Sequence, residues 1–352
     1  MAAKFEHSPE KEAGFLTFFR RQLTFTPTPV DGVDLSGQTG VVTGANVGVG
    51  LECCRQLLDL GLSKLILAVR DDAKGQTAAA ELAKDRDATH VAIEVWKLDL
   101  SDYDSVVAFA DRAKTLATLD IVIMNAAVIP FQFNLNPKTK HEEGFQVTYL
   151  STTLLTLLLL PVAASKRSSQ KQPTRITLVS TEGAAWSAFP QRNAVPLLAA
   201  FDEPVVGGVG EFQNRHFTIK LLGQLMLAKL AAVVPPSDVA VLNAASPGMC
   251  HDTQLARGVD DTFAGKLVKT LITRRVGYTA AVGSRTVVDA AVKHGAESHG
   301  QYFSGQKIRP MAPIVYTEEG KVIMERLWQE TLDGLCFSGV RDIIGKISKG
   351  QS

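Results

Sequence analysis

The chain has 352 residues, 45% of them hydrophobic and 21% charged, so it can bury a full core as one large α/β domain. Its 37 lysines and arginines almost balance 36 aspartates and glutamates, which gives a net charge of +1. This balance argues against a basic surface for nucleic acid, so no nucleic-acid partner is expected. The four cysteines lack the spacing and the histidine partners of a zinc site. We therefore predict no metal and a reducing, cytoplasmic location.

Residues 1–36 form an N-terminal arm with apolar side chains near helical spacing, at Phe15, Leu16, Phe18, Phe19 and Leu23. This pattern predicts an amphipathic helix that packs against the main domain. The alternative is weak contact of the arm with a membrane surface. The arm lacks the basic-then-apolar order of a signal peptide. The longest apolar stretch, residues 154–164, is too short to cross a bilayer and is expected to be a core helix.

Short β-branched runs alternate with helical segments from residue 40 onward, at 41–43, 64–69, 90–96, 121–124, 175–180 and 239–243. Six such strands predict an α/β fold, a doubly wound parallel sheet with helices on both faces, over residues 37–352. The ligand crevice of such a sheet lies at the carboxyl ends of its strands. The Pro- and Gly-rich stretch 187–214 is interpreted as a functional, substrate-covering loop, and a helix is predicted over 318–335.

A glycine-rich turn joins the first predicted strand to the helix that follows it. Residues 43–50 read TGANVGVG, and the expected binding residues are Thr43, Gly44, Asn46, Gly48, Val49 and Gly50. Glycines allow a tight turn and close backbone approach, while the free amides of a helix N-terminus can bind a pyrophosphate. A turn of this kind also occurs without a ligand, so it does not identify a dinucleotide site by itself.

Later segments place further signals at the ends of successive strands. They are Asp99-Leu100, Asn125-Ala126-Ala127, Ser180-Thr181, a lysine at position 220 and Ser246-Pro247-Gly248. With the glycine-rich turn, this order resembles the short-chain dehydrogenase/reductase family over roughly residues 37–310. It is similar to retinol-dehydrogenase-like members, and the arm and the loop are similar to those of fungal secondary-metabolism members. The resemblance implies a Rossmann-type fold and a nicotinamide coenzyme.

The resemblance also implies a role for each matching residue. Asp99 would contact the adenine amine, Leu100 would pack beside the ring, and the backbone of Asn125 and Ala126 would line the ribose. The turn after Pro247 would present a backbone group near Met249 to the carboxamide. Thr253 would contact phosphate, although it lies one residue beyond the usual threonine position.

Arg70 follows the second predicted strand, where a member selective for NAD usually carries an acid. A guanidinium there favours a 2′-phosphate through charge-assisted hydrogen bonds, with Lys74 as further support. The coenzyme expected is therefore NADP(H). The alternative is an exposed turn arginine that Asp71 and Asp72 neutralise.

The expected catalytic residues are Thr181, His216, Lys220 and Thr148. In the family a tyrosine stands four residues before the lysine and donates a proton to the carbonyl; here His216 holds that position. Thr181 matches the family serine that hydrogen-bonds the carbonyl, and Thr148 matches the asparagine that supports the lysine through a water. Lys220 would also hold the nicotinamide ribose. The five tyrosines lie elsewhere, and none precedes a lysine by four residues.

A histidine beside a lysine ammonium should have a pKa below the usual value of about 6.5 and be neutral at pH 7. It could polarise a carbonyl or accept a proton, or it could only fill space. The leading hypothesis is an NADP(H)-dependent oxidoreductase acting on a bulky, largely apolar carbonyl or alcohol. One rival is a non-redox isomerase, dehydratase or cyclase, and the other is a catalytically silent binding protein. The resemblance also allows a homodimer through helices near 145–160 and 220–233.

Overall fold

The computed structural model describes residues 5–84, 86–87, 89–251 and 275–350. Its centre is an eight-stranded sheet in the order β3-β2-β1-β4-β5-β6-β7-β8, parallel except for the last pair. The strands are β1 Thr39–Thr43, β2 Lys64–Val69, β3 Ala92–Lys97, β4 Ile121–Met124, β5 Thr174–Val179, β6 Ala240–Ser246, β7 Tyr302–Ser304 and β8 Lys307–Arg309. The predicted fold class and all six predicted strands are confirmed. The sequence analysis missed β7 and β8, which have three residues each.

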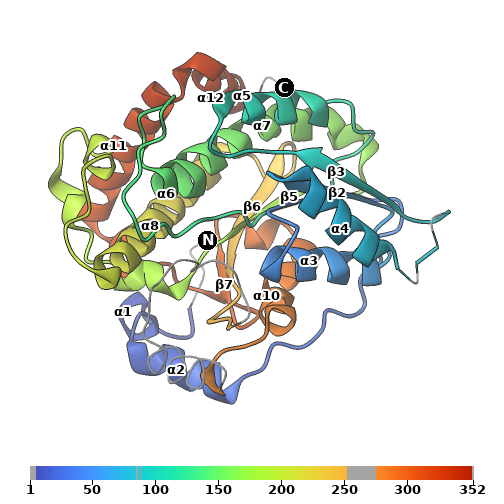
Figure 1. Ribbon diagram of the computed structural model, residues 1–352, viewed down its shortest axis with the longest axis horizontal. Coiled ribbons are helices and arrows are strands. Elements are labelled where there is room, and N and C mark those ends of the chain that lie inside the picture. The colour runs from blue at the N-terminus through green and yellow to red at the C-terminus, as the bar shows by residue number, and fades with distance from the viewer. Residues whose placement is uncertain (1–4, 85, 88, 252–274, 351–352) are drawn as a thin grey trace.

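Helices cover both faces of the sheet (Figure 1). One face carries α3 Gly48–Asp59, α4 Asp72–Ala83 and α10 Ala280–Val292, and the other carries α5 Tyr103–Ala113, α7 Ser151–Lys166 and α8 Val209–Val233. Alternate strand residues point to opposite faces, so Val41 belongs to one buried core and Val42 to the other. Because both faces are buried, the strands are almost continuously apolar.

The C-terminal helices α11 Glu318–Gly334 and α12 Val340–Ser348 pack on α8 and α7. A hydrogen bond of 2.8 Å joins Tyr149 Oη, just before α7, to Thr331 Oγ1 of α11. The helical segments Glu143–Ser169 and Val209–Val233 are long and apolar enough to cross a membrane, but most of their residues are buried in this core. The core helix predicted over 154–164 is therefore confirmed. α11 and α12 cover part of the surface of these two helices, and the homodimer expected through them stays a prediction.

The N-terminal arm contains α1 Pro9–Glu12 and α2 Phe15–Thr24, which confirms the predicted amphipathic helix. Phe18 is buried, and its ring centroid lies 5.1 Å from that of Trp186 in the main domain. Trp186 Nε1 also donates a hydrogen bond of 2.9 Å to the carbonyl oxygen of Ala13. The arm thus packs against the main domain, as expected. Phe15, Leu16 and Leu23 stay exposed on α2, and contact of this face with a membrane stays a prediction.

Candidate active site

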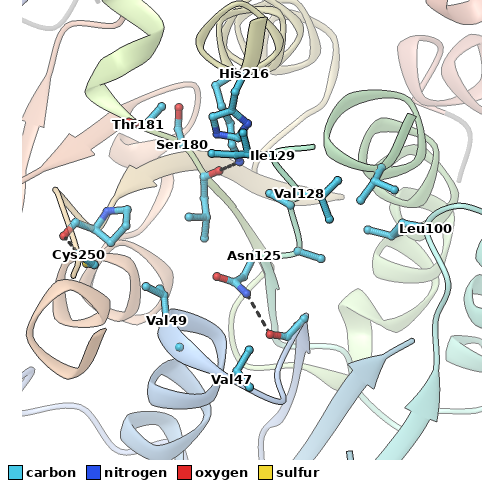
Figure 2. Close-up of a pocket in the computed structure, with 18 of the residues that line it drawn as sticks. Val47, Val49, Leu100, Asn125, Val128, Ile129, Ser180, Thr181, His216 and Cys250 are labelled. Atoms are coloured by element: carbon cyan, nitrogen blue, oxygen red, sulfur yellow. Dashed lines mark hydrogen bonds between the residues drawn. The ribbon is translucent and has the colours of Figure 1, made fainter. Parts of the chain in front are cut away.

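A cavity of about 620 Å³ lies at the carboxyl ends of the parallel strands, where the sequence analysis expected the ligand crevice. It runs from the glycine-rich turn after β1 to the N-terminal half of α8 (Figure 2). Most of the predicted site residues line it: Gly44, Asn46, Gly48, Val49, Arg70, Asp99, Leu100, Asn125, Ala126, Thr181, His216, Lys220 and Met249. Thr43, Gly50 and Thr148 do not line it, and Thr253 lies outside the described residues.

Gly44 and Gly50 let the turn after β1 close on itself. A Cβ added to Gly50 would lie 2.4 Å from the carbonyl oxygen of Gly44, and Gly44 itself has a φ of +64°. Thr43 Oγ1 accepts a hydrogen bond of 2.9 Å from the backbone N–H of Ala126. Asn125 Nδ2 donates 2.9 Å to the carbonyl oxygen of Thr43. Thr43 and Gly50 therefore shape this end of the cavity without lining it.

Helix α3 starts at this turn with no side-chain cap and no acid in its first turn. Its first backbone amides and the positive end of its dipole therefore suit an anionic group. Asp99 lines the same part of the cavity and is oriented by Ser101, whose backbone N–H and hydroxyl both donate to Asp99 Oδ1, at 3.0 Å and 2.6 Å. Asp99 Oδ2 has no hydrogen-bond partner among the described residues and can accept from an amine. The residues at this end fit an adenosine diphosphate group.

Arg70 lines the cavity, and its guanidinium has no ionic or hydrogen-bonded partner within the part of the chain that the structure describes. Asp71 caps α4 and instead pairs with Lys74, whose Nζ lies 3.3 Å from Asp71 Oδ2. The interpretation that Asp71 neutralises Arg70 is therefore not supported. Lys74 does not line the cavity, so Arg70 is the better placed of the two for a phosphate.

At the other end of the cavity, His216 on α8 lies near Ser180 and Thr181, which follow β5 (Figure 2). Lys220, one turn after His216 on α8, lines the same cavity. Lys220 Nζ donates a hydrogen bond of 2.7 Å to the carbonyl oxygen of Val179. His216 is only 5% exposed, and its Nδ1 has no partner among the described residues. Thr181 Oγ1 accepts 3.1 Å from the N–H of Gly183, so its hydroxyl proton remains available.

Burial dominates the electrostatics of this pair. Burial, and then the charge of Lys220, lower the pKa of His216 to about 3, although a backbone hydrogen bond with Val128 opposes the change. Burial also lowers the pKa of Lys220 from its ordinary value to about 8. At pH 7 the site therefore holds a neutral imidazole beside an ammonium that loses its proton as the pH rises through about 8. The neutral histidine expected from the sequence agrees with this environment.

Thr148 lies in the π-helical turn Gln146–Leu150 before α7 and is buried. Its hydroxyl accepts 3.2 Å from the N–H of Val128 and donates 3.4 Å to the carbonyl oxygen of Val128. The predicted support of Lys220 by Thr148 through a water stays a prediction. Because the backbone of Val128 faces His216, the structure gives Thr148 an indirect, positioning relation to His216.

The turn after β6 brings Met249 to the cavity, but both backbone groups of Met249 are already bonded to the arm. Its N–H donates 3.2 Å to Gln22 Oε1, and its carbonyl oxygen accepts 3.1 Å from Gln22 Nε2. A carboxamide held at this turn would therefore need another group alongside Met249. His251 follows in the same segment and is another polar residue that could have approached the nicotinamide. It does not line the cavity, and its backbone N–H donates to the carbonyl oxygen of Tyr278.

None of the residues 187–214 lines the cavity. The segment is bonded to α11, where the Glu330 carboxylate accepts from the N–H groups of Leu197 and Leu198 at 2.9 Å and 2.8 Å. Its last residues are also helical, because α8 begins at Val209. The structure gives no support for a cover over the substrate, and the role of 187–214 as a substrate loop stays a prediction.

Several residues that line the cavity were not predicted, because their sequence pattern does not indicate a binding role. Val128, Ile129, Phe217 and Cys250 are apolar or weakly polar side chains with no motif of their own. Ser180 stood beside the chosen Thr181, and both line the cavity. Ser180 Oγ accepts 3.3 Å from Gln224 Nε2, one turn after Lys220 on α8, so it is a second hydroxyl at this end.

Residues 38–185 match the sequence family described as "short chain dehydrogenase". The short-chain dehydrogenase fogG of Aspergillus ruber is 42% identical over 99% of this chain and 100% of its own. The short chain dehydrogenase/reductase mfmJ of Annulohypoxylon moriforme is 42% identical over 93% of each. Salutaridine reductase of Papaver somniferum shares the fold, with a TM-score of 0.56 at 22% identity over 76% of this chain and 99% of its own. The chain therefore belongs to the short-chain dehydrogenase/reductase family and is an oxidoreductase by family.

Proposed function

We propose that the protein is an NADP(H)-dependent oxidoreductase that interconverts a bulky, largely apolar ketone and its alcohol in fungal secondary metabolism. One observation carries this proposal. A single cavity holds His216, Lys220 and two hydroxyl side chains at one end and, near the other, Arg70, whose guanidinium pairs with no described residue. The family and its fungal relatives named as dehydrogenases support the redox part of the proposal.

The residues at the adenosine end fit a nicotinamide dinucleotide. The uncapped start of α3 would hold the pyrophosphate, Asp99 the adenine amine, and Arg70 a 2′-phosphate. The coenzyme, when bound, supplies or accepts the hydride. NADP(H) is favoured over NAD(H) because no acid among the described residues pairs with the Arg70 guanidinium, and position 70 itself carries no acid to accept from a ribose hydroxyl.

The residues of this chain would handle the oxygen of the substrate and its proton. A neutral imidazole is a weak acid with a single N–H, so His216 would have to turn that N–H from the backbone of Val128 toward the substrate carbonyl in order to orient and polarise it, together with a hydroxyl of Ser180 or Thr181. Lys220, with its pKa lowered to about 8, is the better proton donor. The alkoxide formed on reduction would thus take its proton from the ammonium of Lys220, directly or through His216.

The walls beside His216 argue for an apolar substrate. Val128 and Ile129 follow β4 at the same end of the cavity as His216 (Figure 2). Phe217, the next residue after His216 in the chain, also lines the cavity. Such walls remove water from a hydrocarbon skeleton at a gain of about 25 cal/mol per Å² buried. A bulky alicyclic or aromatic ketone would use this surface better than a small polar one.

Nδ1 of His216 has no hydrogen-bond partner among the described residues, and this favours a second candidate, a non-redox isomerase, dehydratase or cyclase. A neutral imidazole with a free nitrogen can accept a proton from carbon, and the coenzyme would then serve only as part of the architecture.

Two variants of His216 separate these functions on a substrate found by screening apolar ketones. In a reductase, His216→Tyr restores the proton donor of the family and should preserve or raise the oxidation of NADPH. His216→Ala should lower it by roughly 10² to 10⁴, the usual contribution of a general acid or base. In a non-redox enzyme, product would form without a change in nicotinamide absorbance, and His216→Tyr would abolish it. Full turnover of His216→Ala with coenzyme bound normally would remove His216 from either mechanism.

A further inference from the structure

We propose that the N-terminal arm is part of the active site and that Gln22 positions the turn 247–250, which bounds the nicotinamide end of the cavity. This inference rests on the proposed coenzyme, because the turn has this role only if a dinucleotide binds. It assigns to Gln22, 227 residues from Met249 in sequence, a function that the catalytic residues do not supply.

Gln22 contacts the turn in the way that a neighbouring strand would. Its amide accepts from the N–H of Met249 and donates to the carbonyl oxygen of the same residue, at 3.2 Å and 3.1 Å. Gln22 is only 6% exposed, so water does not compete freely for these bonds. Gly248 has a φ of +72°, and a Cβ added there would lie 2.7 Å from Gln22 Oε1. The glutamine therefore fits closely against the turn as well as bonding to it.

The neighbouring arm residue reaches the same turn by a second route. The Arg21 guanidinium lies 3.5 Å from Glu182 Oε1, and both side chains are only 11% exposed. Glu182 Oε2 accepts from the hydroxyl of Ser246 at 2.5 Å, and the same hydroxyl accepts from the N–H of Gly248 at 3.1 Å. Glu182 directly follows Thr181 in sequence. The arm thus holds in place both the turn after β6 and Glu182, the residue next to the hydroxyl-bearing Thr181.

A third contact ties the end of the arm to the segment that pairs with the turn. Tyr278 Oη donates to the carbonyl oxygen of Phe25 at 2.5 Å, and the N–H of Tyr278 donates to the carbonyl oxygen of Met249 at 2.8 Å. Without the arm, the turn would keep this bond to Tyr278 and the bond to Ser246 but would lose its bonds to Gln22. We therefore expect the turn at the nicotinamide end of the cavity to become more mobile, while the adenosine end of the cavity keeps its structure.

The test compares a whole dinucleotide with its adenosine half. Gln22→Met keeps the length of the side chain and removes both hydrogen bonds, and Gln22→Leu is a second variant of similar volume. Thr24→Ala is the matched control, because Thr24 is exposed on the same helix and its hydroxyl bonds only to Arg20 within α2. The ligands are NADPH and adenosine 2′,5′-bisphosphate, measured by titration calorimetry.

Loss of two buried hydrogen bonds should weaken the binding of NADPH by Gln22→Met by about tenfold and leave the bisphosphate within about twofold of wild type. Hydrogen exchange of a peptide spanning 246–251 should be faster in both Gln22 variants than in Thr24→Ala, which gives a readout that needs no ligand. Unchanged NADPH binding, or an equal loss for both ligands, would overturn the inference. A wild-type protein that binds the bisphosphate but no dinucleotide would overturn the proposed function, and this inference with it.

Discussion

Replacing Arg70 by alanine removes the one unpaired guanidinium that the described part of the cavity offers to a 2′-phosphate. A charge-assisted hydrogen bond contributes about 1.5 to 3 kcal/mol. Arg70 is exposed, and salt screens exposed charges, so the lower end of that range applies. We therefore expect NADPH to bind about tenfold more weakly to Arg70→Ala, because about 1.4 kcal/mol corresponds to a factor of ten.

NADH lacks the 2′-phosphate, so its affinity should be almost unchanged. Titration calorimetry with both coenzymes measures the difference, and Lys74→Ala serves as the control because Lys74 pairs with Asp71 and does not line the cavity. That control should leave the preference for NADPH intact. Equal losses for NADPH and NADH in Arg70→Ala, or a larger loss of NADPH in Lys74→Ala, would refute the assignment of coenzyme to Arg70.

Four further outcomes follow from the structure. The folded pKa of His216 is lowered to about 3, so only the unfolded state takes up a proton as the pH falls from 6.5 to 5. Urea titrations should therefore show about 1.6 kcal/mol of stability lost from this group over that range, and His216→Gln should lack that part of the loss. Carbonyl reduction should decline as the pH rises through about 8, where Lys220 loses its proton, and a rate constant that stays flat to pH 10 would exclude its ammonium as donor. Light scattering should give a mass near 37.9 kDa, because α11 and α12 cover part of the faces expected for a dimer; a dimer that persists on dilution would need the remaining surface or another interface. Gly50→Ala should abolish coenzyme binding or folding, since its Cβ would lie 2.4 Å from a backbone oxygen, whereas normal binding would show that the turn can open.

The sequence predicted most of the sheet because each long strand is an apolar run between polar turns. The predicted bounds of β2 and β4 agree with the structure to the residue, 64–69 and 121–124. β7 and β8 were missed because three residues are too few to show an alternating pattern. The start of α8 at Val209 was also missed, since the glycines around it favour an irregular chain.

The coenzyme end of the site was predictable for a similar reason. The turn 43–50 is one continuous segment whose glycines have a direct steric purpose, as the contact between Gly50 and Gly44 shows. The contact between Gln22 and Met249 joins residues 227 positions apart, and neither has a local signal for it. Segment 187–214 was assigned to the substrate from its place in the chain, yet its amides bond to Glu330 of α11. Tertiary contacts of this kind follow only from the packed structure.

The central claim is that this site moves a hydride despite the histidine beside Lys220. It is tested most directly by turning over a screened ketone with NADPH that carries deuterium at both positions of nicotinamide C4, and by weighing the product in a mass spectrometer. The alcohol product should carry one deuterium on the carbinol carbon, and NADP⁺ should form in equal amount. An unlabelled, rearranged or dehydrated product, formed while the labelled coenzyme is recovered unchanged, would contradict it and leave His216 as an acid or base in a non-redox enzyme.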